Sequence, residues 1–402
     1  MRDVLKSVSA TEQNPKWKQM ISRQKLIYKR KDDIRTDFAR DYTRILHCNA
    51  YKRLKHKTQV FFSPSSDHVC TRIEHVGHVE SISNTIATYL GLNTELTKAI
   101  SIAHDLGHSP FGHAGERILN EISKRDINES FWHEKNGVHF VDNIELLEDD
   151  KGNLQNLNLT YAVRDGIISH CGEIDENALK PRDEAIDLSQ YTKPNQFNPY
   201  TWEACVIKIS DKISYIGRDL EDALHLRLLD NTKIQELREI LKIPKNVALN
   251  NANIINELIT DLCKNSSIKD GLCFSEEKLK LINNIKAYNY QNIYSHPRLD
   301  ASNEYFKVVI NRIYNTLKNV YESNNLERNF EKLEKFYPQT ITGFKEYLYR
   351  YSELNCKRKE LNLLNNIIYK DTQTDYIKAI IDYIAGMTDN YAIEIYNEIL
   401  KF

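Results

Sequence analysis

Over long stretches of the chain, apolar residues recur three and four positions apart, which is the spacing of one face of an α-helix. The stretch from Thr71 to Leu90 carries such a stripe at Ile73, Val76, Val79, Ile82, Ile86 and Leu90. Gly91 follows the stripe, and glycine is common directly after the last residue of a helix. The pattern predicts one helix over 71–90.

Two more helices are predicted around the stretch 102–117, which reads I-A-H-D-L-G-H-S-P-F-G-H-A-G-E-R. The first runs over about 95–106, with Asn93 or Thr94 as its cap and Gly107 as its stop. The pair His104 and Asp105 would then lie in its last turn. The second begins near His113 after the turn S-P-F-G, so polar groups of this stretch span a helix, a turn and a helix.

A further long helix is predicted from Trp202 to Leu224, with an apolar stripe at Trp202, Val206, Ile209, Ile213, Ile216 and Leu220. Asp211, Tyr215 and Asp219 follow one another at intervals of four and share a different face. That face is acidic and aromatic, which an ordinary packing stripe does not explain.

The rest of the chain completes an all-α prediction. With 13 Gly and 9 Pro in 402 residues and no alternation of polar and apolar positions, no strands are expected, and N-L-Q-N-L-N-L (153–159) is interpreted as compositional. The polar region 172–200 holds three prolines and is predicted to be a long surface excursion. The final third is predicted to be helical.

Charge gives no whole-chain argument for a nucleic-acid or membrane partner, because 55 Lys and Arg balance 56 Asp and Glu. The segment Lys16–Lys57 is locally basic, and either a solvated helix face or a polyanion contact explains it. Seven cysteines without a C-x-x-C pair predict no disulfide framework and a cytoplasmic location. No run of about 18 apolar residues occurs, so no membrane span is expected.

Four residues on the predicted helices could hold a divalent metal ion, which takes His nitrogens and carboxylate oxygens from rigid elements. They are His75, His104, Asp105 and Asp211. Neighbouring helical residues point roughly 100° apart, so His104 and Asp105 reach one ion only near a helix end. Gly107 is consistent with such an end. Taken singly, each residue has an ordinary structural explanation, and it is the combination that predicts a metal site.

The pattern H…HD…D at these positions resembles the HD phosphohydrolase superfamily. Longer stretches are similar to its deoxyguanosinetriphosphate triphosphohydrolase branch and occur in that family's order. They are R-T-D-F-A-R-D-Y-T-R-I-L (35–46), Y-K-R-L-K-H-K-T-Q-V-F (51–61), T-R-I-E-H (71–75), H-D-L-G-H-S-P-F-G-H-A-G-E (104–116), F-W-H-E (131–134), D-K-I-S-Y-I-G-R-D-L-E-D (211–222) and D-Y-I-A-G-M-T-D-N-Y-A (382–392).

The resemblance implies a helical HD core with additional C-terminal helices. We expect a basic N-terminal segment over 1–34, the phosphohydrolase core over 35–225, and a C-terminal helical region over 226–402 packed on that core. The implied activity is metal-dependent hydrolysis of dGTP or several dNTPs to deoxynucleoside and tripolyphosphate, by attack of water at the α-phosphorus. The base preference is not encoded by any portable motif.

The resemblance also implies roles for individual residues. His75, His104, Asp105 and Asp211 match the family's metal ligands. Arg72 matches a phosphate-binding arginine, and its fork suits a triphosphate. The residues matching further phosphate contacts are His108, His133 and Lys212. Those matching sugar contacts are Gln59, Tyr215 and Asp219.

His113 and Glu116 match the family's acid and base pair. They lie three positions apart, so on a helix they share a face and the carboxylate can orient the imidazole. A protonated His113 could make the 5′-oxygen a better leaving group.

The sequence departs from the family pattern at His78 and Ser109. His78 stands where an apolar or acidic residue is usual, and Ser109 replaces a common proline. One divalent ion is expected, with Mn, Mg, Fe, Zn, Co and Ni all compatible. A second ion would require extra ligands, for which His78 with His108 or His133 are candidates, but we interpret His78 as a neighbour without that role.

Two alternative functions stay open. The chain could hydrolyse another nucleotide, such as a nucleoside monophosphate or a guanosine alarmone, and release orthophosphate or pyrophosphate. It could also be a nucleotide-sensing or single-strand-binding module that uses the basic segment. Relatives form homo-oligomers, often hexamers, and some respond to nucleotide or single-stranded DNA effectors, so we expect an oligomer here.

Overall fold

The protein is described by a computed structural model that covers residues 2–25, 32–62, 68–171, 177–244, 249, 251–321, 325–354 and 358–401. These residues form helices and one two-stranded sheet, which confirms the all-α prediction. The N-terminal elements are η1 (Lys6–Val8), α1 (Trp17–Met20), α2 (Asp37–His47), α3 (Asn49–Arg53) and η2 (Leu54–His56). The central elements are α4 (Arg72–Leu90), α5 (Thr94–Ala103), α6 (Gly112–Ile127), α7 (His133–His139), η3 (Phe140–Ile144), β1 (Leu146–Glu148), β2 (Leu154–Asn156), α8 (Tyr161–Ser169), η4 (Leu188–Gln190) and α9 (Trp202–His225). The C-terminal elements are α10 (Asn231–Leu241), α11 (Asn251–Asn265), α12 (Glu276–Asn289), η5 (Tyr290–Tyr294), α13 (Pro297–Lys318), α14 (Leu326–Glu334), α15 (Pro338–Tyr351), α16 (Gln373–Ala385) and α17 (Asp389–Leu400).

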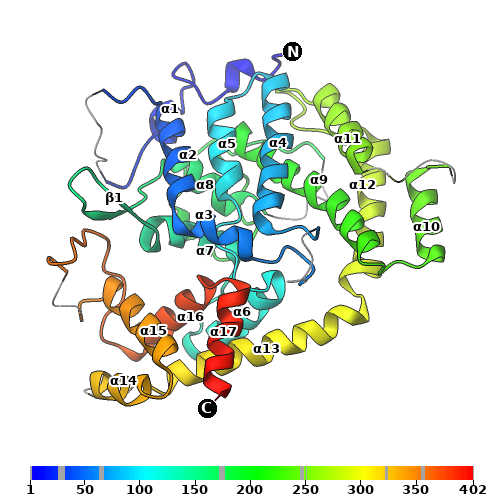
Figure 1. Ribbon diagram of the computed structural model, residues 1–402. Helices are drawn as coiled ribbons and strands as arrows, with labels where there is room; N and C mark the ends of the chain where they lie inside the picture. The colour runs from blue at the N-terminus through cyan, green and yellow to red at the C-terminus, as the bar shows by residue number, and fades with distance from the viewer. Residues whose placement is uncertain are drawn as a thin grey trace.

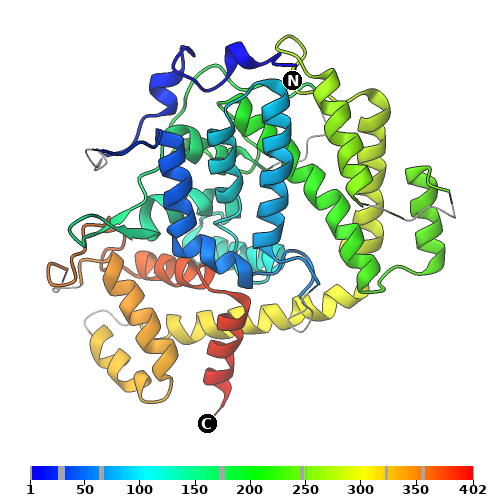
Figure 2. The ribbon, with the colours of Figure 1, turned by 45° about the horizontal axis from the view of Figure 1, so that its top comes forward.

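At the centre of the molecule α5 packs against α2, α4, α8 and α9 (Figures 1 and 2). Helices α11 and α12 flank α9 on one side of this bundle, and α13 crosses beneath it. Helices α14 to α17 lie at the lower end, where α13 contacts α6, α16 and α17. The end of α5 is therefore enclosed by helices from several parts of the chain.

Two hydrophobic clusters hold these elements together. One joins α2, α5, α6 and α8 to α13, α15, α16 and α17, and the other joins α4 and α9 to α11 and α12. Both clusters contain residues from before and after residue 225. The domain limits expected from the sequence stay a prediction.

Local signals set the ends of α4 and α5. Thr71 and Glu74 form a capping box at the start of α4, and Gly91, with φ +81°, ends it in the left-handed conformation. The side chain of Asn93 caps α5 by accepting from two backbone N–H groups. These features confirm the predicted limits of α4 and the predicted start of α5.

The end of α5 differs from the prediction. The helix stops at Ala103, so His104 is its C-terminal cap and Asp105 lies beyond it, not in its last turn. The backbone tightens here, since Leu106 N–H donates to Ala103 O and His108 N–H donates to Asp105 O. His104 still donates its N–H to Ile100 O, and the three-residue hydrogen bonds that follow take the chain out of the helical repeat after it.

The expectation of no strands was wrong. β1 and β2 pair antiparallel, with Leu147 opposite Gln155, so N-L-Q-N-L-N-L contains a strand. A strand of three residues is too short to display an alternating pattern. In the polar region 172–200, residues 172–176 lie outside the described residues, and the remainder has only η4 as regular structure.

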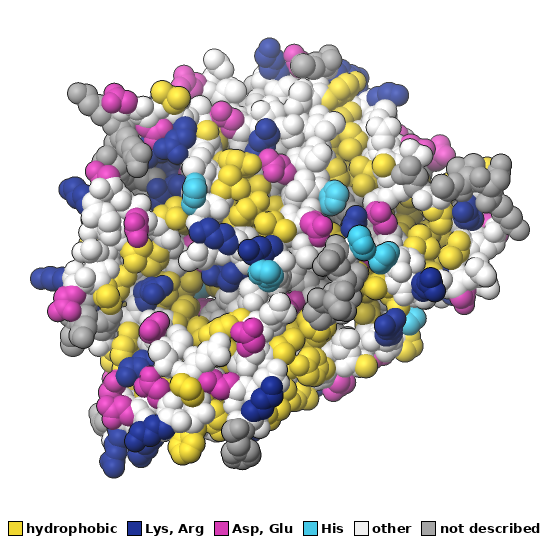
Figure 3. All heavy atoms as spheres, in the orientation of Figure 1, with side chains coloured by type: hydrophobic (Ala, Val, Ile, Leu, Met, Phe, Trp, Pro, Cys, Tyr) yellow, Lys and Arg dark blue, Asp and Glu magenta, His cyan; other side chains and the backbone are white. Residues whose placement is uncertain are grey.

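Several basic side chains of the segment Lys16–Lys57 are bound within the protein. Arg23 lies 2.6 Å from Asp41, Arg53 lies 2.7 Å from Glu145, and Lys57 is buried. Lys29, Arg30 and Lys31 lie outside the described residues. Figure 3 shows basic side chains near the centre of one face with acidic ones scattered around them. These pairings favour a structural role for much of the segment.

Two further sequence expectations concern cysteines and membranes. Cys48, Cys70, Cys205, Cys263 and Cys273 are free thiols, four of them buried. Among the helices that the structure describes, none has the length and apolar composition needed to cross a membrane.

Candidate metal and phosphohydrolase site

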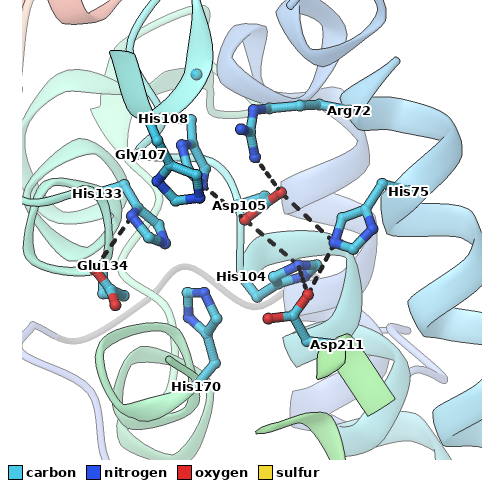
Figure 4. Close-up of polar contacts among 12 residues, drawn as sticks. Arg72, His75, His104, Asp105, Gly107, His108, His133, Glu134, His170 and Asp211 are labelled. Atoms are coloured by element: carbon cyan, nitrogen blue, oxygen red, sulfur yellow. Dashed lines mark hydrogen bonds and ion pairs between the residues drawn. The ribbon is translucent and has the colours of Figure 1, made fainter. Parts of the chain in front are cut away.

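The four predicted metal ligands come together where α4, the end of α5 and the middle of α9 meet (Figure 4). His75 Nε2 lies 2.9 Å from Asp211 Oδ1, and His104 Nε2 lies 3.9 Å from the same oxygen. Asp105 Oδ2 is 3.9 Å from His75 Nε2. The ligand atoms of His75, His104 and Asp211 all lie within 4.8 Å of one another, so their spacing suits a metal site.

His104 carries the observation that best fits a metal ion. Its Nδ1 lies 2.6 Å from Ser101 O, and because a carbonyl only accepts, Nδ1 bears the proton. Nε2 therefore has a free lone pair, yet it is buried without a hydrogen-bond partner among the described residues. A buried acceptor that faces carboxylate oxygens is costly unless a cation lies between them. The residues present fit a divalent ion with nitrogen and oxygen ligands.

Arg72, the first residue of α4, binds the second aspartate of the group. Its guanidinium donates to Asp105 Oδ2 over 2.7 Å, and both side chains are buried. The other oxygen, Asp105 Oδ1, lies 3.2 Å from His108 Nε2. Burial opposes ionisation of Asp105, but His104, His108 and Arg72 together hold the pKa of its carboxyl well below the usual range.

The pKa of His75 is raised by its acidic neighbours. Burial alone would lower this pKa, but the hydrogen bond and charge of Asp211 and the charge of Asp105 outweigh it. An excess of negative charge thus surrounds the imidazole, as expected for a site that binds a cation.

A second group of side chains lies beside the first and contains His108, His113, Glu116 and His133. His113 Nδ1 lies 3.1 Å from Glu116 Oε2, as the helical spacing predicts. His133 Nδ1 lies 3.0 Å from the same oxygen, so one carboxylate contacts two imidazoles. The His113 side chain is 62% exposed, whereas His133 is buried against the stacked ring of His108.

Within this second group, the charges of Glu116 and His133 shift the pKa values of each other. Burial opposes ionisation of Glu116, but His133 and His113 hold the pKa of the carboxyl well below its usual range. Burial would likewise lower the pKa of His133, but Glu134 and Glu116 raise it to about 9. The carboxylate is thus ionised and able to orient both rings near neutral pH.

Gly107 lets α7 approach the turn between the two groups. A Cβ at this position would lie 2.1 Å from His133 O and 2.2 Å from Gly137 N, which leaves no room for any other residue. Asn136 Nδ2 donates to Gly107 O over 2.7 Å and fixes the contact. His133 therefore reaches the site because residue 107 has no side chain.

The C-terminal region also holds the turn S-P-F-G. Asp389, the first residue of α17, accepts from Phe111 N–H and from Thr58 N–H, each over 2.8 Å. Lys57 Nζ donates to His108 O and to Ala385 O, the last residue of α16. Phe111 has φ +63°, a left-handed conformation that is unfavourable for residues other than glycine. Contacts from the far end of the chain thus stabilise a strained turn beside the site.

The remaining predicted residues lie around the two groups. Asp219 is buried on α9 and accepts a hydrogen bond of 2.5 Å from the Tyr294 hydroxyl. Burial raises the pKa of Asp219 to about 7 against the opposing effect of Tyr294. Gln59 Oε1 is buried without a partner in the described structure, whereas its backbone O lies 3.5 Å from Arg72 Nη2. Tyr215 and Lys212 lie on α9 beside Asp211, and their proposed substrate contacts stay predictions.

The structure adds residues to which sequence reasoning gave no role. Glu134 lies 3.3 Å from His133, and His170 follows α8 with its ring centroid 5.0 Å from that of His104. Burial, followed by the charge of His104, lowers the pKa of His170 to about 4. Glu134 lies in the stretch F-W-H-E, which could have drawn attention to it. His170 follows an apolar helix, where a histidine is ordinarily structural, and nothing in the sequence singled out Tyr294.

His78 does not join either group of clustered ligand atoms in the described structure. It lies on α4 one turn after His75, and its side chain is exposed. This placement agrees with its interpretation as a neighbour of the site.

Comparisons with known proteins place the chain in a family. The HD domain family matches residues 72–216, and the phosphohydrolase-associated domain family matches residues 346–398. A deoxyguanosinetriphosphate triphosphohydrolase-like protein of Caldanaerobacter subterraneus is 34% identical over 371 residues, which cover 92% of this chain and 86% of the relative.

Two Rickettsia proteins with the same description are similar over almost the same length. The Rickettsia felis protein is 34% identical over 386 residues, covering 91% of this chain and 92% of the relative. The Rickettsia prowazekii protein is 36% identical over 387 residues with the same coverage of 91% and 92%. The resemblance inferred from the motifs is confirmed, and the chain belongs to the deoxyguanosinetriphosphate triphosphohydrolase-like family of HD phosphohydrolases.

Proposed function

We propose that this HD phosphohydrolase converts a deoxynucleoside triphosphate to the deoxynucleoside and tripolyphosphate. The observation that carries the proposal is the contact of Arg72 with Asp105, which puts a buried guanidinium next to the proposed metal ligands. A guanidinium fork binds phosphate oxygens through two parallel hydrogen bonds, and a polyphosphate offers more oxygens than one metal ion binds. The similarity to deoxyguanosinetriphosphate triphosphohydrolase-like proteins supports this substrate class.

In this proposal His75, His104, Asp105 and Asp211 hold one divalent ion. Such an ion would make water more nucleophilic at neutral pH and neutralise charge on the phosphoryl oxygens. Arg72 binds the triphosphate, and on substrate binding its guanidinium would exchange part of its contact with Asp105 for phosphate oxygens. His108, His133 and Lys212 supply further phosphate contacts.

The proton needed by the leaving 5′-oxygen comes from His113. Its ring is oriented by Glu116 through Nδ1, so Nε2 is free to face a substrate, and its exposure leaves room for one. Glu116 also contacts His133, so protonation of one imidazole changes the charge seen by the other. The sugar lies against Gln59, Tyr215 and Asp219, where the Asp219 carboxylate would accept from the 3′-hydroxyl.

Product analysis tests the substrate and the reaction together. The metal-loaded protein is incubated with each of the four dNTPs, alone and mixed, and the products are separated by ion-exchange chromatography. Deoxynucleoside and tripolyphosphate are expected. Pyrophosphate or orthophosphate would instead indicate an HD hydrolase of another nucleotide, and binding of dNTPs without turnover would indicate a sensing or single-strand-binding module.

A variant of His113 tests the assigned proton donor. His113→Ala should lower kcat by about 10²- to 10⁴-fold, the usual contribution of general acid catalysis. Its metal content, measured by mass spectrometry of the desalted protein, should equal that of the wild type. Full turnover in His113→Ala with normal metal content would refute the assignment, and His47→Ala on α2 provides a matched histidine outside both groups.

Assembly and regulation form a separate part of the proposal. We expect copies of the chain to form an oligomer, with the hexamer of the family as the leading size, and a nucleotide or single-stranded DNA to act as effector. Mass photometry with and without dNTPs or an oligonucleotide measures the size of the oligomer and whether these effectors change it. A monomer under all conditions would contradict this expectation.

A further inference from the structure

A cavity of about 630 Å³ lies among α4, α9, α10 and α11. Helix α11 packs against both α4 and α9 on this side of the molecule (Figures 1 and 2). Small-molecule sites are usually clefts of about 300 to 1,000 Å³. The cavity therefore has room for a small organic molecule.

The cavity is separate from the proposed substrate site. The residues of α9 that line it are Ser214, Gly217, Arg218, Leu220, Glu221 and Leu224. Asp211, Tyr215 and Asp219, which are assigned to the metal and the sugar, follow at intervals of four and share another face of this helix. Ser214 Oγ lies 3.5 Å from His75 Nδ1. A molecule in the cavity would thus lie one side chain away from the HD site without entering it.

Much of the cavity wall is aliphatic. All four helices contribute to it, through side chains that include Ile82, Leu220, Leu224, Leu241, Ile255 and Ile259. Leu224, Leu241 and Ile255 are only partly buried, so apolar surface is left for a ligand to cover. No Phe, Tyr or Trp is among the described residues that line the cavity. Nucleobases bind by stacking on aromatic rings, so this wall favours an aliphatic chain over a nucleotide.

Polar side chains of the wall gather around Glu221. Its Oε2 lies 3.4 Å from Arg218 Nη1 and 3.4 Å from Asn251 Nδ2. The donor Arg218 Nε and the acceptor Asn251 Oδ1 are both buried without a hydrogen-bond partner among the described residues. Such unpaired buried groups are unfavourable. A ligand hydroxyl can supply both missing partners, because it accepts one hydrogen bond and donates another.

The charge around these polar groups is already balanced. Arg218 lies 3.4 Å from Glu221 and 3.4 Å from Asp222. Burial, followed by the charge of Arg218, lowers the pKa of His78, which also lines the cavity. Its ring therefore adds no positive charge near neutral pH. An anionic head group would meet two carboxylates and one guanidinium, so a neutral head group is favoured.

We propose that this cavity binds a neutral, single-chain aliphatic molecule with a hydroxyl head group. The chain packs on the aliphatic wall, and the hydroxyl accepts from Arg218 Nε and donates to Asn251 Oδ1. This site is additional to the substrate site, and the inference does not depend on the proposed activity.

Binding of short 1-alkanols to the full-length protein tests the proposal. Isothermal titration calorimetry, carried out below the solubility limit of each alcohol, should show one equivalent of 1-octanol bound per chain. The Kd should fall about fourfold with each methylene from 1-hexanol to 1-octanol, because each one buries further apolar surface. Octanoate should bind about tenfold more weakly than 1-octanol, or worse, because its charge must be desolvated beside two carboxylates.

Variants locate the ligand in the cavity. Thr85→Trp fills the cavity from an exposed position on α4 and should abolish binding. Asn251→Leu removes the acceptor with little change in size and should raise the Kd of 1-octanol about 2- to 10-fold. Asn253→Leu is the matched control, because Asn253 is exposed on the same helix and does not line the cavity, and it should bind as the wild type does.

No saturable binding of 1-octanol, equal affinity for 1-octanol and octanoate, a Kd independent of chain length, or unchanged binding by Thr85→Trp would each overturn the proposal. Circular dichroism establishes that each variant is folded. If Thr85→Trp does not fold, Ser81→Trp replaces it from the same face of α4. The comparison of the alcohols with octanoate on the wild type decides the chemistry of the head group without any variant.

Discussion

Asp389 provides the sharpest test of how the C-terminal region supports the site. Its buried carboxylate accepts three hydrogen bonds, from Phe111 N–H, Thr58 N–H and Thr58 Oγ1, at 2.8, 2.8 and 2.5 Å. Phe111 belongs to the turn between His108 and His113, and Thr58 precedes Gln59. Substitution of one residue near the C-terminus should therefore disturb a turn 278 residues away in sequence.

The magnitude follows from the groups left without partners. Asp389→Ala leaves the buried Phe111 N–H and the partly buried Thr58 N–H without their acceptor, at about 1 to 3 kcal/mol each. It also removes a favourable charge at the start of α17 worth about 0.3 to 1 kcal/mol. We expect a loss of about 3 to 5 kcal/mol in the free energy of unfolding, a large share of the 5 to 15 kcal/mol typical of folded proteins. Asp389→Asn keeps one oxygen acceptor, so its loss should be about 1 to 2 kcal/mol.

Urea denaturation followed by circular dichroism measures the stability of both variants. Turnover of dNTP and metal content are then compared under conditions where Asp389→Asn is fully folded. A shift of about 1 Å in the turn would lower kcat by up to about 100-fold. The metal content should not change, because Asp389 makes these hydrogen bonds to Phe111 and Thr58 and not to the proposed metal ligands. Asp375→Asn is the matched control, since Asp375 is also in the first turn of its helix, α16, but is only partly buried.

Unfolding of Asp389→Asn and Asp375→Asn at the same urea concentration would contradict this prediction, because the hydrogen bonds of Asp389 would then contribute nothing. Loss of metal from Asp389→Asn in proportion to its loss of activity would contradict it as well. That result would mean that Asp389 supports the metal ligands and not the turn that carries Phe111.

Three other predictions address pH, packing and metal. The pKa of Asp219 is about 7 when folded because of burial, against the opposing hydrogen bond from Tyr294, and about 3.9 when unfolded. Its protonation therefore stabilises the fold fully below about pH 4, and this contribution is lost as the pH rises through 7. Between pH 5 and 8 the free energy of unfolding, measured with urea, should fall by about 1 to 3 kcal/mol more for the wild type than for Asp219→Asn. Parallel plots of this free energy against pH for the two proteins would contradict the prediction. Gly107→Ala should destabilise the protein by about 3 kcal/mol or more, because its Cβ would lie 2.1 Å from His133 O. Gly77→Ala, with nothing within 4 Å of its Cβ, should instead stabilise α4 by about 0.5 to 1 kcal/mol. Equal thermal midpoints of the two variants would contradict the predicted clash at Gly107. Chelation should lower the free energy of unfolding by about 2.7 kcal/mol relative to protein kept at a metal concentration 100 times its Kd, and an unchanged midpoint would argue against a metal ion bound only to the folded state.

The sequence by itself determined the features that depend on neighbours within a few turns. Apolar periodicity placed α4 and α9, Asn93 and Gly91 marked helix ends, and the spacing of His113 and Glu116 predicted their contact. These signals are local, since capping and the 3.6-residue repeat act within one helix. The motifs then identified the family, which the comparisons confirm.

Only the tertiary structure decided which groups share a partner. Glu116 contacts both His113 and His133, and Asp105 lies between Arg72 and His108, because helices distant in sequence pack at the end of α5. Such contacts depend on the packing of whole helices, and no periodicity within one segment encodes them.

The same reason explains the residues that pattern reading passed over. His170 and Tyr294 have ordinary sequence surroundings, and Asp389 lies in a family motif that assigned it no role. Each acquires its position through contacts with segments more than 60 residues away, for example Asp219 with Tyr294 at a separation of 75. The sequence determined the helices and the list of chemically capable side chains. The packing of those helices decided which side chains meet around Asp105.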